Sequence, residues 1–151
     1  MLLLGLLAFV CLARAAPAPE AVFNTDQGNL RLADLRGKVV YLDFWAAWCS
    51  PCRSSFPWMN EMHARYADKG LVVLAVNLDK DPKELKAFLA QMPAQFRLAY
   101  DPQGKVAEQY QLKGMPSSYL IDRQGQIHQV HVGFRDKDKA ATFSGDVRAV
   151  Q

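Results

Sequence analysis

Residues 44–53 read Phe44-Trp45-Ala46-Ala47-Trp48-Cys49-Ser50-Pro51-Cys52-Arg53. The apolar run over residues 39–46 that leads into this stretch is typical of a strand buried on both faces. Beyond the cysteines, large side chains recur at helical spacing until Gly70, namely Phe56, Met59, His63 and Tyr66. The pattern therefore predicts a buried strand followed directly by a helix, with Cys49 at the helix start and Cys52 about one turn inside.

A cysteine at a helix start has a chemical advantage. Thiolates rather than thiols attack disulfides, and the free amide groups and the dipole at a helix N-terminus stabilise negative charge. Lowering a thiol pKa from ~8.5 to ~7 raises the thiolate fraction at pH 7 from about 3% to about half, a gain of roughly 2 kcal/mol. The position of the pair thus favours thiol–disulfide exchange.

Other interpretations of the cysteine pair remain open at this point. A structural disulfide is one, although such a short loop restricts the unfolded chain little. A Cu(I) carrier using the two thiolates is another, but His128 and His131 point to opposite faces of a strand and supply no third ligand. Zinc and haem sites do not fit, because a second Cys pair is missing and Arg53 stands where haem attachment needs His.

The rest of the chain alternates apolar runs with helical stripes. Strands are expected over residues 71–78, 117–121 and 126–132, and helices over residues 85–92 and 106–110. The last two strands are joined as a hairpin through Asp122-Arg123-Gln124-Gly125. A tail helix is indicated by Ala140, Phe143, Val147 and Val150, although Gly145 disfavours it. This order predicts an α/β fold.

The N-terminal residues have the pattern of an export signal. Residues 2–13 are apolar, too few to span a bilayer comfortably, and Ala13-Arg14-Ala15 suits cleavage by signal peptidase. We expect a signal peptide over residues 1–15 with cleavage near Ala15, an exposed leader over residues 16–28, and one domain over residues 29–151. Lipidation of Cys11 is a weaker alternative, because the preceding Ala8-Phe9-Val10 lacks the expected small residue.

Composition limits the possible partners. The chain has 151 residues, is 50% hydrophobic and 22% charged, and carries a formal net charge of +3. Lys and Arg are spread along the chain rather than gathered in a run. A single globular domain without a nucleic-acid partner is therefore expected.

The redox stretch and a second motif together resemble a known family. The second motif is Gly114-Met115-Pro116-Ser117-Ser118-Tyr119-Leu120-Ile121-Asp122, and Leu35-Arg36-Gly37-Lys38 precedes the first core strand. Together with Pro57 these segments, spread from about Phe23 to Gly133, resemble the TlpA/ResA branch of the thioredoxin superfamily. The resemblance implies a thioredoxin fold, a central mixed β-sheet flanked by helices on both faces. It also implies an exported or membrane-tethered reductant of client protein disulfides, for example in cytochrome c maturation.

The same resemblance assigns roles to individual residues. Cys49 is then the attacking nucleophile and Cys52 the resolving thiol, with a membrane thiol-relay protein as electron donor. Pro116 is the cis-proline beside them, where sequence alone also allows a trans turn, and Met115 would pair its backbone with an extended substrate. Trp48 would offer clients a flat aromatic surface. Neither a cofactor nor a metal is expected, and the protein is expected to be a monomer in the periplasm or another extracytoplasmic compartment.

Asp43 is the third candidate catalytic residue. It alternates along the strand with Val39, Tyr41 and Trp45, which places a carboxyl group in an apolar layer, and it matches the buried acid of thioredoxin six residues before the first cysteine. Burial raises the pKa of such an acid, so that it can accept a proton from Cys52. An ordinary hydrogen-bonded Asp at a strand edge is the alternative.

The chain departs from the resemblance at two positions. Ser55 stands where many relatives carry a Glu, and Val76 stands where thioredoxin places a lysine near its acid, so Asp43 is expected to lack a cationic partner. Since no His or Lys lies between the cysteines, we expect a reductant rather than a strong oxidant. A copper carrier and a thiol peroxidase remain as alternative functions.

Overall fold

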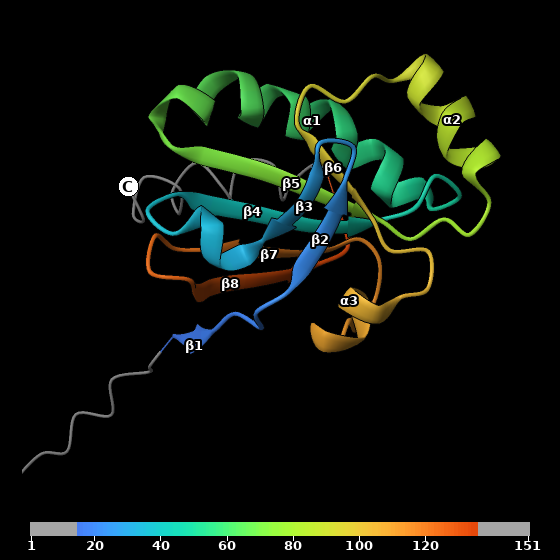
Figure 1. Cartoon of the computed structure of the whole chain (residues 1–151). Helices are drawn as coiled ribbons and strands as arrows, with labels where there is room; N and C mark the ends of the chain where they lie inside the picture. The colour runs from blue at the N-terminus through green and yellow to red at the C-terminus, as the bar shows by residue number, and fades with distance from the viewer. Residues whose placement is uncertain (1–14, 136–151) are drawn as a thin grey trace, which may run out of the picture.

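The sheet and its helices are arranged in layers in the computed structural model, which describes residues 15–135 (Figure 1). In this described part of the chain the sheet has eight strands, in the order β1-β8-β7-β4-β5-β6-β2-β3. Their bounds are β1 Ala16–Pro17, β2 Val22–Thr25, β3 Gly28–Arg31, β4 Val39–Trp45, β5 Leu71–Asn77, β6 Arg97–Tyr100, β7 Ser117–Ile121 and β8 Gln126–Val132. Strands β4, β5 and β6 run parallel and the other pairs are antiparallel, so the predicted mixed sheet is confirmed.

The centre of the sheet follows from two apolar runs. Every residue of β4 is buried, and β5 is buried at all but one position. The strands are in parallel register, with Val39 beside Leu71 and Trp45 beside Asn77. Strands covered on both faces need no polar alternation, which explains the near-continuous hydrophobicity of both runs. Both expected strands are confirmed, each one residue shorter than predicted.

Within residues 15–135, three α-helices and two short 3-10 helices join the strands. The bounds are η1 Leu32–Leu35, α1 Ser50–Tyr66, η2 Ala67–Lys69, α2 Pro82–Gln91 and α3 Lys105–Gln109. The α1–η2 segment ends at Gly70, whose φ of +94° lies in the left-handed region that favours glycine. At the start of α2, the Asp81 side chain accepts a hydrogen bond from the Lys83 amide. The α2 and α3 segments correspond to the predicted helices with shifted ends.

The sheet separates two hydrophobic cores, and helices lie on both faces as predicted (Figure 1). On one face, α1 and α2 pack over the Tyr41 and Trp45 side of β4. On the other, η1 and α3 cover the side that carries Leu42 and Phe44. The alternation along β4 therefore sends Asp43 into the core beneath α1.

The expected leader over residues 16–28 is instead part of the fold. Two of its residues, Ala16 and Pro17, pair with β8, and β2 pairs with both β3 and β6. Within it Ala18, Ala21 and Phe23 are buried in the second core. Proline and turn residues suggest an exposed segment locally, but contacts with distant strands bury it. The ordered domain thus begins before residue 29.

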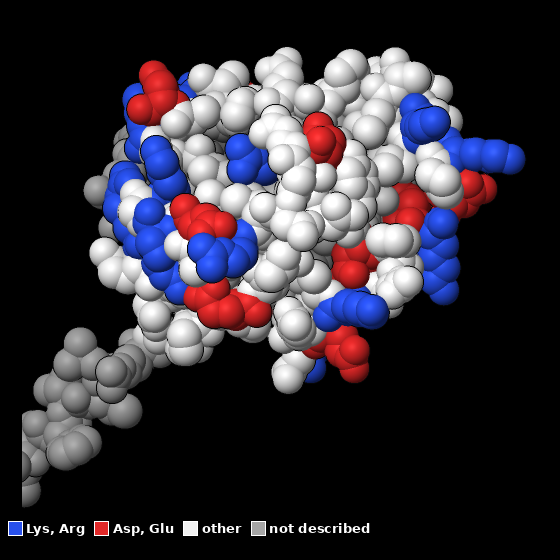
Figure 2. Space-filling model, in the orientation of Figure 1, with Lys and Arg blue, Asp and Glu red and all other residues white. Residues whose placement is uncertain are grey.

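Several predictions concern residues outside the described range. Residues 1–14 of the signal peptide expected over residues 1–15, and the tail helix expected within residues 136–151, lie there. Within residues 15–135, no helix has the length and apolarity needed to cross a bilayer. On the face seen in Figure 2, positive and negative side chains are intermixed around a broad uncharged area.

Candidate active site

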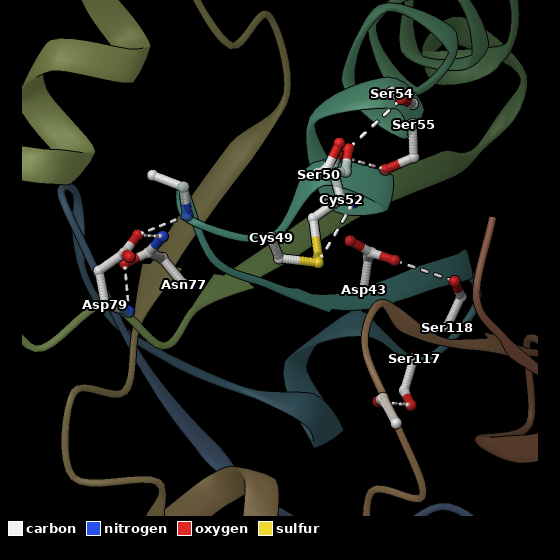
Figure 3. The surroundings of a disulfide bond; sticks show 12 residues. Asp43, Cys49, Ser50, Cys52, Ser54, Ser55, Asn77, Asp79, Ser117 and Ser118 are labelled. Carbon is white, nitrogen blue, oxygen red and sulfur yellow. Dashed lines mark hydrogen bonds between the residues drawn. A yellow bond between two sulfur atoms is a disulfide. The ribbon is translucent and has the colours of Figure 1, made fainter.

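Cys49 and Cys52 form a disulfide at the junction of β4 and α1 (Figure 3). Cys49 is the N-cap of α1, and its Sγ accepts a hydrogen bond from the Cys52 amide at 3.4 Å. Pro51 occupies the first turn, where a missing N–H costs nothing. The free amides at this end can stabilise a thiolate on Cys49 once the disulfide is reduced. Cys49 retains 6% exposure and Cys52 none, so the two cysteine residues differ in exposure.

The loop before Cys49 is held by a buried carboxylate that sequence reasoning missed. Asp79, 6% exposed, accepts hydrogen bonds on Oδ2 from the Ala47 amide at 2.8 Å and from the Asn77 side chain at 2.6 Å. The Asn77 side-chain oxygen in turn accepts from the Asp79 amide. Figure 3 shows this clamp on the opposite side of the disulfide from Asp43. The polar residues directly after the apolar run of β5 were the signal that could have suggested it.

Asp43 lies fully buried beneath the start of α1. Its Oδ1 accepts a hydrogen bond from the Ser118 hydroxyl at 2.9 Å, and its buried Oδ2 has no hydrogen-bond partner within the described residues. Desolvation raises the pKa of Asp43 to about 7, against a smaller lowering by the Ser118 hydrogen bond. Figure 3 shows the carboxyl group between the disulfide and Ser118. A carboxyl group that titrates near neutrality can both accept and return protons.

The residue beside Asp43 on β5 is Ala75 rather than Val76. The register pairs Asp43 with Ala75, and Val76 pairs with Phe44 in the opposite core. The prediction that Val76 occupies the position facing the acid was therefore wrong by one residue, which in a strand changes the face. The expectation that Asp43 lacks a cationic partner on β5 still holds, because alanine, like valine, carries no positive charge. Ser55 is buried in α1 and donates its hydroxyl to the Cys52 carbonyl, so it supplies no carboxyl group here.

The second motif lies where β7 begins. The Met115–Pro116 peptide bond is cis, as expected from the family resemblance. The Pro116 carbonyl accepts a hydrogen bond from the Gly133 amide at 2.8 Å, which links this loop to the end of β8. Met115 is partly buried and packs against the core that contains both cysteines. Strand β7 carries this loop to the active site because it pairs with β4.

The two tryptophans of the redox stretch occupy different environments. Trp45 is fully buried and packs against Phe56 and Phe88, whereas Trp48 is 66% exposed. Trp48 also lines two adjoining cavities of about 250 and 540 Å³ that lie between the start of α1 and α2. Both cavities also include Arg53, whose guanidinium lies 5.4 Å from the ring centre of Phe88. One tryptophan thus belongs to the core and the other to an accessible surface groove.

Comparison with known proteins establishes the family. The profile of the AhpC/TSA family matches residues 12–130. The chain belongs to this family. Thiol-disulfide oxidoreductase ResA of Oceanobacillus iheyensis is 33% identical over 128 residues, covering 85% of this chain and 67% of that protein. ResA of Geobacillus kaustophilus is 34% identical over 127 residues, 83% of this chain and 73% of the relative.

Solved structures support the same assignment of this AhpC/TSA family member. The crystal structure of a candidate thiol:disulfide interchange protein DsbE from Chlorobium tepidum is 48% identical, with a TM-score of 0.86 over 93% of this chain and 99% of that one. The predicted thioredoxin fold and the predicted TlpA/ResA-like resemblance are therefore confirmed. The protein is a thiol–disulfide oxidoreductase.

The structure gathers the predicted residues at one end of the sheet and adds others. Cys49, Cys52 and Asp43 lie together (Figure 3), while Trp48 borders the groove beside them. His128 and His131 lie on opposite faces of β8, the first exposed and the second half-buried. Sequence reasoning missed four residues around the site, which are Tyr41, Asn77, Asp79 and Ser118.

Proposed function

We propose that this protein reduces disulfides in client proteins, with Cys49 as nucleophile, Cys52 as resolving thiol and Asp43 as acid–base group. The observation that carries the proposal is the contrast between the two cysteine residues. Cys49 caps the helix and keeps some exposure, while Cys52 is fully buried. A thiol without access to solvent needs a protein group to take its proton, and Asp43 is the buried carboxyl group on this side of the pair (Figure 3).

The reaction begins with the reduced protein. The Cys49 thiolate attacks one sulfur of the client disulfide, forms a mixed disulfide with it and releases the other client sulfur as a thiolate. The Cys52 thiol then gives its proton to Asp43, and its sulfur attacks the Cys49 sulfur. The bond between Cys49 and the client breaks, the second client sulfur leaves as a thiolate, and both client thiolates take protons from solvent. The Cys49–Cys52 disulfide in the structure corresponds to the product of this step.

Client recognition uses the surface around Cys49. The exposed Trp48 ring and the groove that it borders accept the client chain next to its cysteine, and the backbone of Met115, before the cis-proline, pairs with an extended client segment. Trp48→Ala should raise KM for a protein disulfide about tenfold while leaving the rate with a small aromatic disulfide nearly unchanged. Trp48→Phe, which keeps a flat ring, should restore most of the affinity. A loss of rate with both substrates would instead place Trp48 in the chemistry.

The proposal also includes where the protein acts and which partners it has. Export through the segment over residues 1–15, a role in cytochrome c maturation and re-reduction by a membrane dithiol donor are supported by the sequence pattern and the resemblance. We expect a monomer. Cys52→Ala should trap clients as mixed disulfides on Cys49, since the resolving thiol is missing. Recovery of extracytoplasmic c-type cytochromes among the trapped proteins would support the maturation role, and recovery of other clients alone would exclude it.

Three assays separate this function from its alternatives. The protein should catalyse the reduction of insulin by a dithiol donor. It should consume hydroperoxide more slowly than it reduces disulfides, and it should not retain Cu(I) stoichiometrically against a thiol competitor.

The Asp43→Asn variant tests the acid–base assignment directly. It should form the mixed disulfide at a near-normal rate and resolve it 10²- to 10⁴-fold more slowly, on the usual scale of general-base catalysis. Unchanged resolution would remove Asp43 from the mechanism.

A further inference from the structure

A chain of two hydroxyl groups leads through the buried core to Asp43. The Tyr41 hydroxyl donates to Ser118 Oγ at 2.8 Å, and Ser118 Oγ donates to Asp43 Oδ1 at 2.9 Å. All three residues are at most 5% exposed. Tyr41 and Asp43 share a face of β4, and Ser118 is the register partner of Asp43 on β7. The sheet itself therefore aligns the three groups.

The chain occupies only one oxygen of the carboxyl group. Each hydroxyl has a single proton, and here both protons point toward Asp43, so Oδ1 is an acceptor. A proton on Oδ1 would compete with the one that Ser118 donates. Oδ2 is buried and has no hydrogen-bond partner within residues 15–135. In Figure 3 the oxygen not bonded to Ser118 lies on the disulfide side of the carboxyl group.

We propose that Tyr41 and Ser118 are positioning residues that hold Asp43 by Oδ1 and leave Oδ2 as the oxygen that takes up the Cys52 proton. This inference rests on the proposed function and extends it to two further residues. During resolution the proton moves from Cys52 Sγ to Asp43 Oδ2 while the Cys52–Cys49 bond forms and the client thiolate leaves. The aligned hydroxyls stabilise the carboxylate that accepts the proton, because hydrogen bonds to an ionised group are stronger than those to a neutral one.

The groups around Asp43 limit what else could tune it. Tyr41 and Ser118 approach from β4 and β7, and Ala75 is its neighbour on β5. Cys52 lies on the α1 side, and His131 on β8 is the register partner of Ser118. His131 is thus the ionisable side chain to control for. Ser117 offers a matched control, because it is equally buried but points to the opposite core and donates to the Gly114 carbonyl.

The test is an NMR titration of the Asp43 carboxyl carbon in the disulfide form. Ser118→Ala should raise the titration midpoint by about one pH unit, as expected for loss of a hydrogen bond to a charged group. Tyr41→Phe should raise the midpoint by a smaller amount. Ser118→Thr, which keeps the hydroxyl, should have the midpoint of the wild type. Ser117→Ala and His131→Gln should leave it in place. An unchanged midpoint in Ser118→Ala, or an equal shift in Ser117→Ala, would overturn the inference.

The pH profile of mixed-disulfide resolution completes the test. In Ser118→Ala the midpoint of this profile should rise together with the NMR midpoint, and Ser118→Thr should reverse both. If Asp43→Asn slows resolution but the Ser118→Ala profile stays in place, the hydroxyl chain has no role and the proposed acid–base function survives. If Asp43→Asn resolves at the normal rate, the proposed function itself fails, whatever the NMR midpoints show.

Discussion

Two effects of opposite sign act on the carboxyl group of Asp43. Burial removes water from the ion and raises the pKa, and the hydrogen bond from Ser118 lowers it by a smaller amount. The result, a pKa of about 7, lies well above the ordinary value of 3.8. The folded protein therefore binds a proton between these pH values that the unfolded chain does not. This difference makes the stability of the protein depend on pH.

Asp43→Asn should stabilise the fold increasingly as the pH rises. Below about pH 4 the acid is protonated in both states and the two proteins should have similar free energies of unfolding. Above pH 7 the wild type must ionise a buried group, which corresponds to roughly 4 kcal/mol for this pKa. Urea denaturation of the disulfide forms between pH 4 and pH 8 measures the gap. Asp68→Asn, at an exposed position, should show no such trend, and a gap that stays constant with pH would mean that Asp43 is solvated.

The two cysteines should also differ in reactivity. In the reduced protein Cys49 should react with iodoacetamide at least tenfold faster than Cys52 at pH 7, because only Cys49 combines access with the helix N-terminus. Mass spectrometry of peptides after short exposure gives both rates. Similar rates for the two thiols would contradict the assignment of Cys49 as nucleophile.

At the scale of elements, the active site is a junction of α1 with the ends of three strands. Strand β4 delivers the loop to α1, and β7 delivers the Met115–Pro116 loop. From the end of β5, Asp79 holds the Ala47 amide. The N-terminus of α1 can stabilise a thiolate only if this loop keeps Cys49 at the cap position. We therefore expect the Asp79 clamp to matter for rate as well as for stability.

Asp79→Ala should lower both the stability and the exchange rate. Its loss leaves the Ala47 amide and the Asn77 side chain buried without their acceptor, at a cost of about 1–3 kcal/mol. Asp81→Ala is the matched control, because this exposed carboxylate caps α2 two residues further along. It should cost about 1 kcal/mol and leave the exchange rate intact. Equal rates in the two variants would show that the clamp supports only the fold.

At the scale of the whole molecule, the N-terminal strands complete the second core. Phe23 on β2 is 1% exposed and packs in the core that contains Leu42 and Phe44, although β2 lies two strands away from the centre of the sheet. Val22, the preceding residue on the same strand, is 54% exposed. The segment over residues 16–27 is thus a structural part of the domain rather than a spacer.

Phe23→Ala should destabilise the protein by roughly 3–5 kcal/mol, the usual cost of removing a buried aromatic side chain. Val22→Ala should cost less than about 1 kcal/mol, since its side chain faces solvent. Thermal unfolding of both variants provides the comparison. If the two variants unfold alike, β2 contributes little to the core and the original boundary near residue 29 would be the better description.

Local patterns in the sequence determined the central unit of this protein. The apolar runs of β4 and β5, the cysteine pair at the start of α1 and the hairpin of β7 and β8 were all predicted. The cysteine pair and the hairpin depend on residues close together in the chain. The two central strands are buried on both faces, so each appears in the sequence as a continuous apolar run. The position of Asp43 in the core beneath α1 also followed, because side chains alternate along a strand.

Only the tertiary structure decided how distant segments meet. Ser118 reaches Asp43, and Asp79 reaches Ala47, through strand pairings between segments far apart in the chain. Ala75 rather than Val76 lies beside Asp43 because of the register between β4 and β5. A shift of one residue in this register would move each side chain of β5 to the other face of the sheet. The short strands of residues 16–25 exist because other strands supply their hydrogen bonds and their core. Pairing and register between remote strands are determined by the packing of the whole sheet, and local sequence patterns do not contain that information.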